Sequence, residues 1–406
     1  MVRKSLCAAI IACWMVMAYG TASARVKGVC QYCHTMHNSQ GGQPMAKTPG
    51  VAYWSGSSIN TADANVSAAN EHLLRTDCIG CHSSTDNTTV VTFAGNHVPI
   101  VHNMQAPAYR GSGSTNALAG GNFFWSDTTN NGAGSNMLNG HNVTQANTRL
   151  SVAPGLNSGG SMCLPSCHYT LYRPLDIDFT TKLTGCQGCH YQQFHHKEKG
   201  PGAHQDPTYR FLIGPSGNGM GGYYVQGIED PGFEQSPNAT VHNVYMANGA
   251  SKAGVFAAAP TGMVNGNNCG LSAFCAACHG AFHEDTKDSS GVWIRHPIDV
   301  LVGKLVDDGH ENESFFYNGP NGYGVNTYDP AVPVAFNIAN PYTDPVSSYG
   351  TVDDTRGKVT CVSCHRTHAS PYPQMLRFAY NMIIAGNSAT AGGDGCFACH
   401  TEKSLQ

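Results

Sequence analysis

Charged side chains are scarce in this 406-residue chain. Aspartate, glutamate, lysine and arginine together make up 12% of the sequence, about half of the share that is usual in soluble globular proteins. The few lysines and arginines do not gather into a basic patch, and this argues against nucleic acid as a partner. Long apolar runs are also missing, since the longest one, Leu6 to Tyr19, is shorter than the roughly 20 residues of a membrane helix. The sequence therefore predicts neither a nucleic-acid-binding protein nor a membrane span.

The first 24 residues have the pattern of a secretory signal peptide. Arg3 and Lys4 precede the apolar run, and Ala22-Ser23-Ala24 supplies the small residues of a cleavage site. A transmembrane anchor is the alternative, and the length of the run disfavours it. We expect a mature chain of residues 25–406 that is exported through the periplasm and is secreted, either to the medium or to the cell surface.

Regular secondary structure is expected to be sparse. The chain contains 47 glycines and 21 prolines, which interrupt helices and strands and favour loops. We predict a mostly irregular chain with a few short α-helices and little strand. Two helices are predicted. Val66 to Arg75 has Ser67 as a possible N-cap, and Gln374 to Ala385 places its apolar residues on one face. A chain of this kind has little aliphatic core, so another component must organise it.

Cysteine and histidine supply that component. Of the 17 cysteines, two belong to the signal peptide, and 14 of the other 15 fall into seven groups that each end in histidine. Cys269 is the one left over, and we expect it to be an unreactive thiol. Six groups have the form Cys-x-x-Cys-His, and one, "CLPSCH" at Cys163/Cys167/His168, is one residue longer. The other six are Cys30/Cys33/His34, Cys78/Cys81/His82, Cys186/Cys189/His190, Cys275/Cys278/His279, Cys361/Cys364/His365 and Cys396/Cys399/His400.

Cys-x-x-Cys-His is the attachment motif of c-type haem. Two thiols add to the two vinyl groups of one porphyrin edge, and the histidine that follows binds the iron from below. A disulfide framework would not need a histidine after every second cysteine. Zinc sites combine two half-sites, and a thioredoxin-like redox motif occurs once in a fold. We therefore predict seven covalently attached haems, with the paired cysteines as thioether ligands and the seven histidines of the motifs as proximal iron ligands.

The remaining histidines decide what the far face of each iron binds. Thirteen of the 20 histidines lie outside the motifs, more than seven distal positions need. No motif ends in lysine, so nothing marks an iron with an open catalytic face. We expect histidine on both faces of every haem, with distal ligands drawn from His37, His102, His141, His196, His242, His283, His296 and His368.

Chain length limits which haem a distal histidine can reach. Two histidines on one iron need Cα atoms about 12 to 13 Å apart, whereas three residues span at most about 10 to 11 Å. His37 therefore cannot bind the haem of His34, and His368 cannot bind that of His365. His283 lies at the limit for the haem of His279. Each of these histidines either binds another haem or makes a hydrogen bond to a propionate or the backbone.

Several segments carry a family resemblance. "CQYCHTMHNSQGG", "LAGGNFFW" followed by "GHNV", "YRFLIG", "CAACHGAFH" followed by "IRHP", and "TCVSCHRTHASPYPQMLRF" resemble, in the same order, segments of the OmcS-like family of filament-forming multihaem c-type cytochromes of metal-reducing bacteria. The resemblance covers most of the mature chain. It implies a single domain wrapped around a stack of haems, bis-histidine ligation, and assembly of copies into an extracellular filament, or nanowire.

The same resemblance implies a role for His37 and reveals one difference. In the family, the histidine of "HTMH" is donated to a neighbouring subunit, so His37 would bind the haem of Cys361/Cys364/His365 in the next copy. Family members carry six haems, and "CLPSCH" is the additional motif here. The seventh haem either extends the row of haems or branches from it.

We expect an electron-transfer protein rather than an enzyme, with no catalytic residue. Electrons would pass between bis-histidine haems, within and between subunits, from periplasmic or outer-membrane cytochromes to a mineral, an electrode or another cell. One alternative is a multihaem reductase of a small oxyanion or nitrogen compound, which needs an iron with an open face. The other is a monomeric periplasmic electron shuttle.

Overall fold

A computed structural model describes about two fifths of the chain, in segments spread from Val26 to Cys396. The predicted signal peptide, residues 1–24, lies outside the described residues, as does the segment that contains the predicted seventh motif, "CLPSCH". The structure describes residues 26, 28–47, 53–59, 69, 73–76, 78–107, 118–126, 139–141, 186, 189–190, 208–213, 224–230, 238–247, 263–264, 268–276, 296, 298–299, 301–302, 327–338, 344–352, 356–383 and 396.

Helices in the described part are short, and most are single turns. Three of them, η1, α2 and α4, begin at the first cysteine of a motif. No helix among the described residues has the length and apolarity of a membrane span. The α-helices are α2 (Cys78–His82), α3 (Leu271–Ala276) and α4 (Cys361–Cys364), and the 3-10 helices are η1 (Cys30–Tyr32), η2 (Phe123–Trp125), η7 (Val346–Tyr349), η8 (Pro373–Met375) and η9 (Tyr380–Met382).

The strands are short as well and form two sheets and two hairpins. The larger sheet has the order β12-β13-β10-β11-β14, with β9 also paired to β10, and the smaller one has the order β4-β3-β5-β8. β1-β2 and β6-β7 are antiparallel hairpins. The strands are β1 (Ser39–Gln40), β2 (Gln43–Pro44), β3 (Trp54–Ser55), β4 (Ser58–Ile59), β5 (Ser83–Ser84), β6 (Val90–Phe93), β7 (Asn96–Pro99), β8 (His102–Asn103), β9 (Thr208–Ile213), β10 (Tyr224–Ile228), β11 (Val244–Met246), β12 (Met263–Val264), β13 (Asn268–Cys269) and β14 (Ala335–Phe336).

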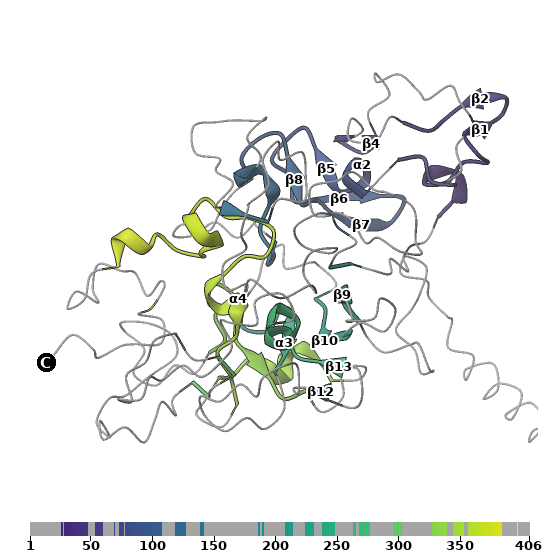
Figure 1. The fold of residues 1–406 in the computed structure, drawn as a ribbon. Helices are drawn as coiled ribbons and strands as arrows, with labels where there is room; N and C mark the ends of the chain where they lie inside the picture. Colours follow the sequence, from purple (N-terminus) through teal and green to yellow (C-terminus); the bar gives the residue numbers. More distant parts are fainter. Residues whose placement is uncertain are drawn as a thin grey trace, which may run out of the picture.

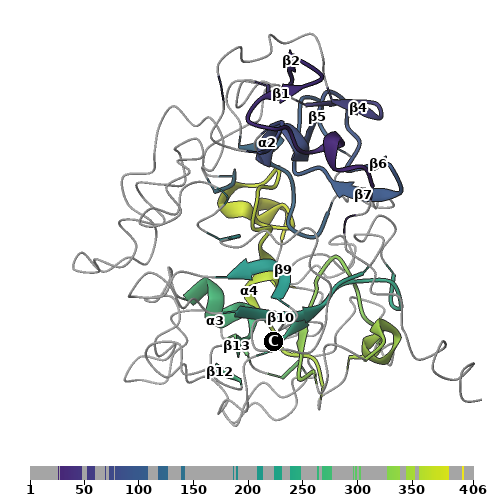
Figure 2. The ribbon, with the colours of Figure 1, turned by 90° about the vertical axis from the view of Figure 1, so that its right-hand side faces the viewer.

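Figures 1 and 2 show that these elements gather into an upper and a lower group. β1 to β8 and α2 lie in the upper group, and β9, β10, β12 and β13 lie in the lower group with α3 and α4. In Figure 1 the β1-β2 hairpin lies at the right, and the yellow C-terminal segment that contains η8 and η9 lies at the left. The two segments therefore occupy opposite sides of the described part of the chain.

Apolar packing is concentrated around the larger sheet. A cluster of twelve buried side chains includes Val244, Val334 and Phe336, each at most 1% exposed. Burying a side chain of this type contributes about 1.5 to 3 kcal/mol. A smaller cluster of Trp54, Val91 and Ile100 packs in the upper group. The predicted fold class, irregular chain with few short helices and short strands, is confirmed for the described residues.

The predicted helix from Val66 to Arg75 is wrong where the structure describes it. Residues 73–76 form no helix, and Leu74 pairs with His34 in an antiparallel bridge. The Thr35 amide donates to the Leu73 carbonyl at 2.7 Å, and the Arg75 amide donates to the Cys33 carbonyl at 2.9 Å. The backbone of this segment is extended because it pairs with the first cysteine motif.

The predicted helix from Gln374 to Ala385 is also wrong. The structure has two separate 3-10 turns, η8 and η9, and residues 384–385 lie outside the described part. Gln374 and Met375 have φ values of 59° and 60°, which a right-handed helix does not contain. The Met375 carbonyl accepts from the Arg366 amide, and the Arg377 amide donates to the Cys364 carbonyl, both at 2.8 Å. Pairing with the motif has replaced the helix.

Candidate functional site

The described cysteine motifs fold as single helical turns. The histidine amide donates to the carbonyl of the first cysteine, four residues earlier, at 2.9 Å for His34, 2.8 Å for His190 and 3.0 Å for His365. Cysteines three residues apart lie on the same side of such a turn. The turn thus presents both thiols together and the histidine directly after them, as attachment of one haem edge requires.

Hydroxyl groups anchor the turn of the motif at Cys361. Thr360 and Ser363 form a capping box around α4. The buried Ser363 hydroxyl accepts from the Thr360 amide at 3.0 Å and donates to the Pro333 carbonyl at 2.5 Å. The Thr360 hydroxyl lies 2.8 Å from that of Ser272 on α3. The motif is therefore fixed to α3 and to the loop before β14.

Five histidines share one arrangement of their rings. In each, Nδ1 lies 2.6 to 2.8 Å from a backbone carbonyl oxygen. A carbonyl can only accept, so the ring proton is on Nδ1 and the lone pair is on Nε2, the nitrogen that a metal binds. Three of these residues are predicted proximal ligands and two are predicted distal ligands. The pairs are His82 with Pro99, His190 with Arg210, His365 with Gln374, His141 with Thr367 and His242 with Asn243.

His242 has the most enclosed ring of the five. Its exposed fraction is 0%, and its Nε2 atom is buried with no hydrogen-bond partner among the described residues. The ring stacks on Tyr328, with ring centres 3.5 Å apart and an angle of 14° between the planes. Burial lowers the pKa of His242. The carbonyls of Asn243, Ala239 and Tyr349 partly offset this shift, so the ring has polar neighbours, and a neutral ring whose Nε2 makes no close hydrogen bond in the described part of the chain is compatible with an iron ligand.

A histidine cluster lies where distant parts of the chain meet. The ring centres of His190 and His368 are 6.3 Å apart. By analogy with zinc, each metal–nitrogen bond is about 2 Å long, and the ring centre lies roughly 1 Å beyond the nitrogen. Two imidazoles on opposite sides of one metal therefore have centres roughly 6 Å apart. The observed separation thus fits two rings on opposite faces of one haem iron.

Burial lowers the pKa of His82, His190 and His368. Burial first, and the neighbouring His190 second, lower the pKa of His368 to about 3. Burial, with His82 and Arg210 as lesser causes, lowers the pKa of His190 to about 4. His82 and His141 also lower the pKa of His368, so four rings belong to one histidine cluster: His82, His141, His190 and His368.

The backbone holds His141 and His368 side by side. Ala369 bridges to Gly121 on one side and to Gly140 on the other. The His368 amide donates to the Gly120 carbonyl at 2.7 Å, and the His141 amide donates to the His368 carbonyl at 3.1 Å. Sequence reasoning missed these contacts, although the glycines of "LAGG" and "NGHN" are the small residues that such a close approach needs.

The other predicted distal ligands are placed differently. His102, on β8, is buried at 4% exposure, whereas His37 and His296 are exposed. The side chain of Cys269 lies outside the described residues. So do the remaining predicted ligands, which are distal His196 and His283, proximal His168, His279 and His400, and the thioether cysteines Cys163, Cys167, Cys278 and Cys399.

The described cysteines are consistent with thioether attachment. None of the ten described cysteines forms a disulfide within the described part of the chain. Burial raises the pKa of Cys33, and the positive charge of Arg75 partly offsets this effect. Burial, followed by the nearby thiolates of Cys396 and Cys361, raises the pKa of Cys364 to about 12. Cys396 therefore lies close enough to Cys364 to affect its pKa.

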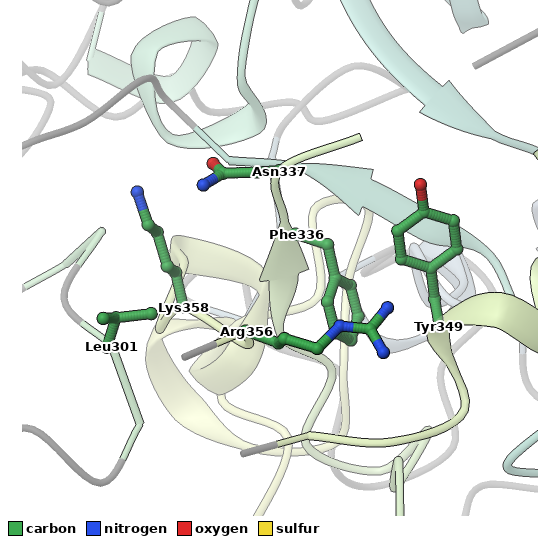
Figure 3. Close-up of a pocket in the computed structure, with 6 residues that line it drawn as sticks. All are labelled: Leu301, Phe336, Asn337, Tyr349, Arg356 and Lys358. Carbon is green, nitrogen blue, oxygen red and sulfur yellow. The ribbon is translucent and has the colours of Figure 1, made fainter. Parts of the chain in front are cut away.

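One pocket of about 300 Å³, including space open to solvent, lies beside β14 and is lined by Leu301, Phe336, Asn337, Tyr349, Arg356 and Lys358. Figure 3 shows the Arg356 guanidinium extending towards Phe336 and Tyr349. Arg356 donates to the Ser348 carbonyl at 2.6 Å, and its charge lies 5.7 Å from the centre of the Tyr349 ring. None of the described residues that line the pocket is a predicted haem ligand, so the pocket is separate from the histidine cluster.

Repeated Cys-x-x-Cys-His turns and histidines with an available Nε2 define the class of the protein, a c-type cytochrome with covalently bound haem. Residues 355–405 match a family described as the doubled CXXCH motif. The chain is 26% identical over 385 residues to C-type cytochrome OmcS of Geobacter sulfurreducens. This match covers 86% of this chain and 78% of that protein. The chain is thus OmcS-like over most of its length, and the resemblance expected from the sequence is confirmed.

Two solved structures are also similar. They are the outer membrane cytochrome S filament and the OmcS nanowires, both of Geobacter sulfurreducens, with TM-scores of 0.48 and 0.46. Each is 18% identical to this chain, and each match covers 94% of this chain and 96% of the other.

Proposed function

We propose that this chain is an extracellular electron-transfer protein, a heptahaem c-type cytochrome that polymerises with its own copies. It is an electron carrier rather than an enzyme. Periplasmic or outer-membrane cytochromes are its donors, and a mineral, an electrode or another cell is its acceptor. A cleaved signal peptide of residues 1–24 and a single domain of residues 25–406 belong to this proposal.

The observation that carries the proposal is the spacing of His190 and His368. Their ring centres are 6.3 Å apart, and both rings are buried and neutral near pH 7. We assign them as the two axial ligands of the haem attached at Cys186 and Cys189. His368 follows His365 by only three residues, so the chain itself ties this haem to the haem at Cys361.

The rest of the histidine cluster extends the row of haems. His82 and His141 lie close enough to His368 to lower its pKa, and each holds its ring through Nδ1. We assign these two rings to the haem at Cys78 and Cys81. Three haems would then follow in the order Cys78, Cys186 and Cys361, linked through the histidine cluster.

Bound haem supplies the one-electron chemistry, with a potential that depends on its axial ligands and surroundings. The contribution of the protein is to fix the ligands and exclude water. Hydrogen bonds from Nδ1 to carbonyls hold the rings in one orientation. With a histidine on each face, the iron would have no site for a substrate, and this favours electron transfer over a reductase.

Assembly is the second part of the proposal. His37 cannot reach the haem of His34, because the chain between them is too short, and its side chain is exposed. We propose that it binds the haem at Cys361 and Cys364 of a neighbouring copy. In Figure 1 the β1-β2 hairpin lies in the upper group and α4 in the lower group, apart from each other, so a contact between them in different copies would be repeated from copy to copy in a filament.

Spectroscopy and electron microscopy of the purified secreted protein test the proposal. We expect only low-spin haem, seven haems per chain, and filaments. A high-spin haem that binds nitrite or another small oxyanion would favour a reductase instead. Discrete particles of monomer size at high protein concentration would contradict polymerisation and favour a soluble shuttle.

A further inference from the structure

The backbone at His37 forms a tight turn. Met36 and Ser39 pair in an antiparallel bridge, with the Ser39 amide donating to the Met36 carbonyl at 2.9 Å and the Met36 amide donating in return at 3.3 Å. His37 and Asn38 are the two central residues of this turn, with φ values of 52° and 73°. This is a two-residue hairpin connection of the kind that needs positive φ at both central positions.

Histidine is an uncommon choice at the first central position. Such turns favour Asn-Gly or Gly-Gly, and the next turn of this chain uses Gly41 and Gly42 with φ values of 59° and 77°. Positive φ is uncommon for residues other than glycine, although asparagine, aspartate and histidine adopt it more often than the rest, and residues held in such conformations concentrate at functional sites. The turn places His37 at its tip, where the side chain is exposed beside Met36, which is 71% exposed.

Asn38 holds this turn in place. Its side chain is 4% exposed, and its Oδ1 atom accepts from the Met45 amide at 2.8 Å and from the Ala46 amide at 2.5 Å. These two amides lie just after β2, so the bonds join the turn to the far strand of the β1-β2 hairpin. Asparagine also tolerates positive φ better than most residues. One side chain thus secures both the backbone conformation and the position of the turn.

We propose that Asn38 is a positioning residue that holds His37 at the surface in the geometry with which it reaches a haem of a second copy of this chain. The inference rests on the proposed function and adds a residue to it. Asn38 does not itself touch the neighbouring copy. It acts through His37, because loss of the Oδ1 acceptor releases the turn from the β1-β2 hairpin and leaves the direction of the His37 side chain undefined.

The test compares wild type with three variants of the full secreted chain, each with its haem content measured. Asn38→Ala removes the acceptor and disfavours positive φ. Asn38→Asp keeps a carboxylate acceptor and is the conservative variant. Asn238→Ala is the matched control, because Asn238 also accepts two backbone amides in an exposed turn, at 2.9 Å from Thr240 and 3.0 Å from Val241.

Electron microscopy and haem spectroscopy give the two readouts. We expect Asn38→Ala to keep the wild-type haem content, to lose about tenfold or more of its filament mass, and to show one haem per chain without its second histidine. Asn38→Asp and Asn238→Ala should form filaments as wild type does. The spectroscopic change distinguishes a misplaced ligand from a general loss of structure.

Four outcomes would overturn the inference. Asn38→Ala filaments equal to wild type would show that Oδ1 is not needed, and loss of filaments in Asn238→Ala as well would show a general effect of breaking a turn. Loss of filaments in Asn38→Asp with normal haem content would exclude the acceptor role. If the wild-type protein itself forms only monomers, the proposed polymerisation fails and this inference fails with it.

Discussion

The carbonyl oxygen of Ala369 lies 2.0 Å from the position that a Cβ atom on Gly121 would occupy. Gly121 has a φ of 81°, so a side chain there would be strained as well as blocked. This close approach holds the segment of His368 against the loop that begins at Leu118. The geometry of the histidine cluster thus depends on a residue that binds nothing itself.

Gly121→Ala is therefore expected to destabilise the protein and to disturb the His368 ligand. Overpacking costs about 1 to 3 kcal/mol, and alanine at positive φ adds about 1 to 2 kcal/mol. Urea unfolding of the haem-loaded protein measures the loss. Gly56→Ala is the control, because Gly56 has a φ of 60° but no atom within 4 Å of its Cβ position. An equal loss in both variants would mean that the Ala369 contact contributes nothing.

His368→Ala is expected to remove the second ligand of one haem. That haem should become high-spin in the absorbance and electron paramagnetic resonance spectra, and the number of haems per chain should not change. His97→Ala is the control, since His97 is exposed and its ring lies 3.4 Å from the Thr92 hydroxyl. A fully low-spin spectrum of His368→Ala would contradict the pairing with His190.

The local part of the site could be predicted from the sequence, because it is set by chemistry within five residues. The motif turns at Cys30, Cys186 and Cys361 are fixed by one backbone bond from the histidine to the first cysteine. The exclusion of His37 from its own haem likewise needed only chain length. The sequence did not reveal which distal histidine lies opposite which proximal histidine. His190 and His368, for example, are brought together by contacts between distant segments.

The two wrong helices have the same physical cause. A possible N-cap at Ser67 suggested a helix in Val66 to Arg75, and apolar residues on one face suggested one in Gln374 to Ala385. In the structure the backbones of Leu73 and Met375 pair with residues next to a cysteine motif instead. Where the backbone of a segment pairs with a cysteine motif, the spacing of its apolar side chains does not report a helical face. Tertiary pairing therefore overrides local propensity.

His242→Ala tests whether the buried ring at the lower sheet is a ligand. We expect one haem to lose its low-spin signature, because the Nε2 of His242 is buried without a partner in the described part of the chain. Tyr328→Phe keeps the ring that stacks at 3.5 Å and loses only a hydroxyl 3.4 Å from the Asn243 carbonyl. That variant should have the wild-type spectrum. An unchanged spectrum in His242→Ala would make His242 a core residue.

Ser363→Ala tests the anchoring of the motif at Cys361. The substitution leaves the buried Pro333 carbonyl and the Thr360 amide without the hydroxyl that satisfies both, so the free energy of unfolding should fall by about 1 to 3 kcal/mol. Ser58→Ala, at an exposed position, should change it by less than about 0.5 kcal/mol. Because α4 also carries Cys364, Ser363→Ala should lower the free energy of unfolding more in the haem-loaded protein than in a second background. That background is the Cys361→Ala/Cys364→Ala variant, which cannot attach this haem. Equal losses in the two backgrounds would show that Ser363 stabilises the loop before β14 and not the haem-binding turn.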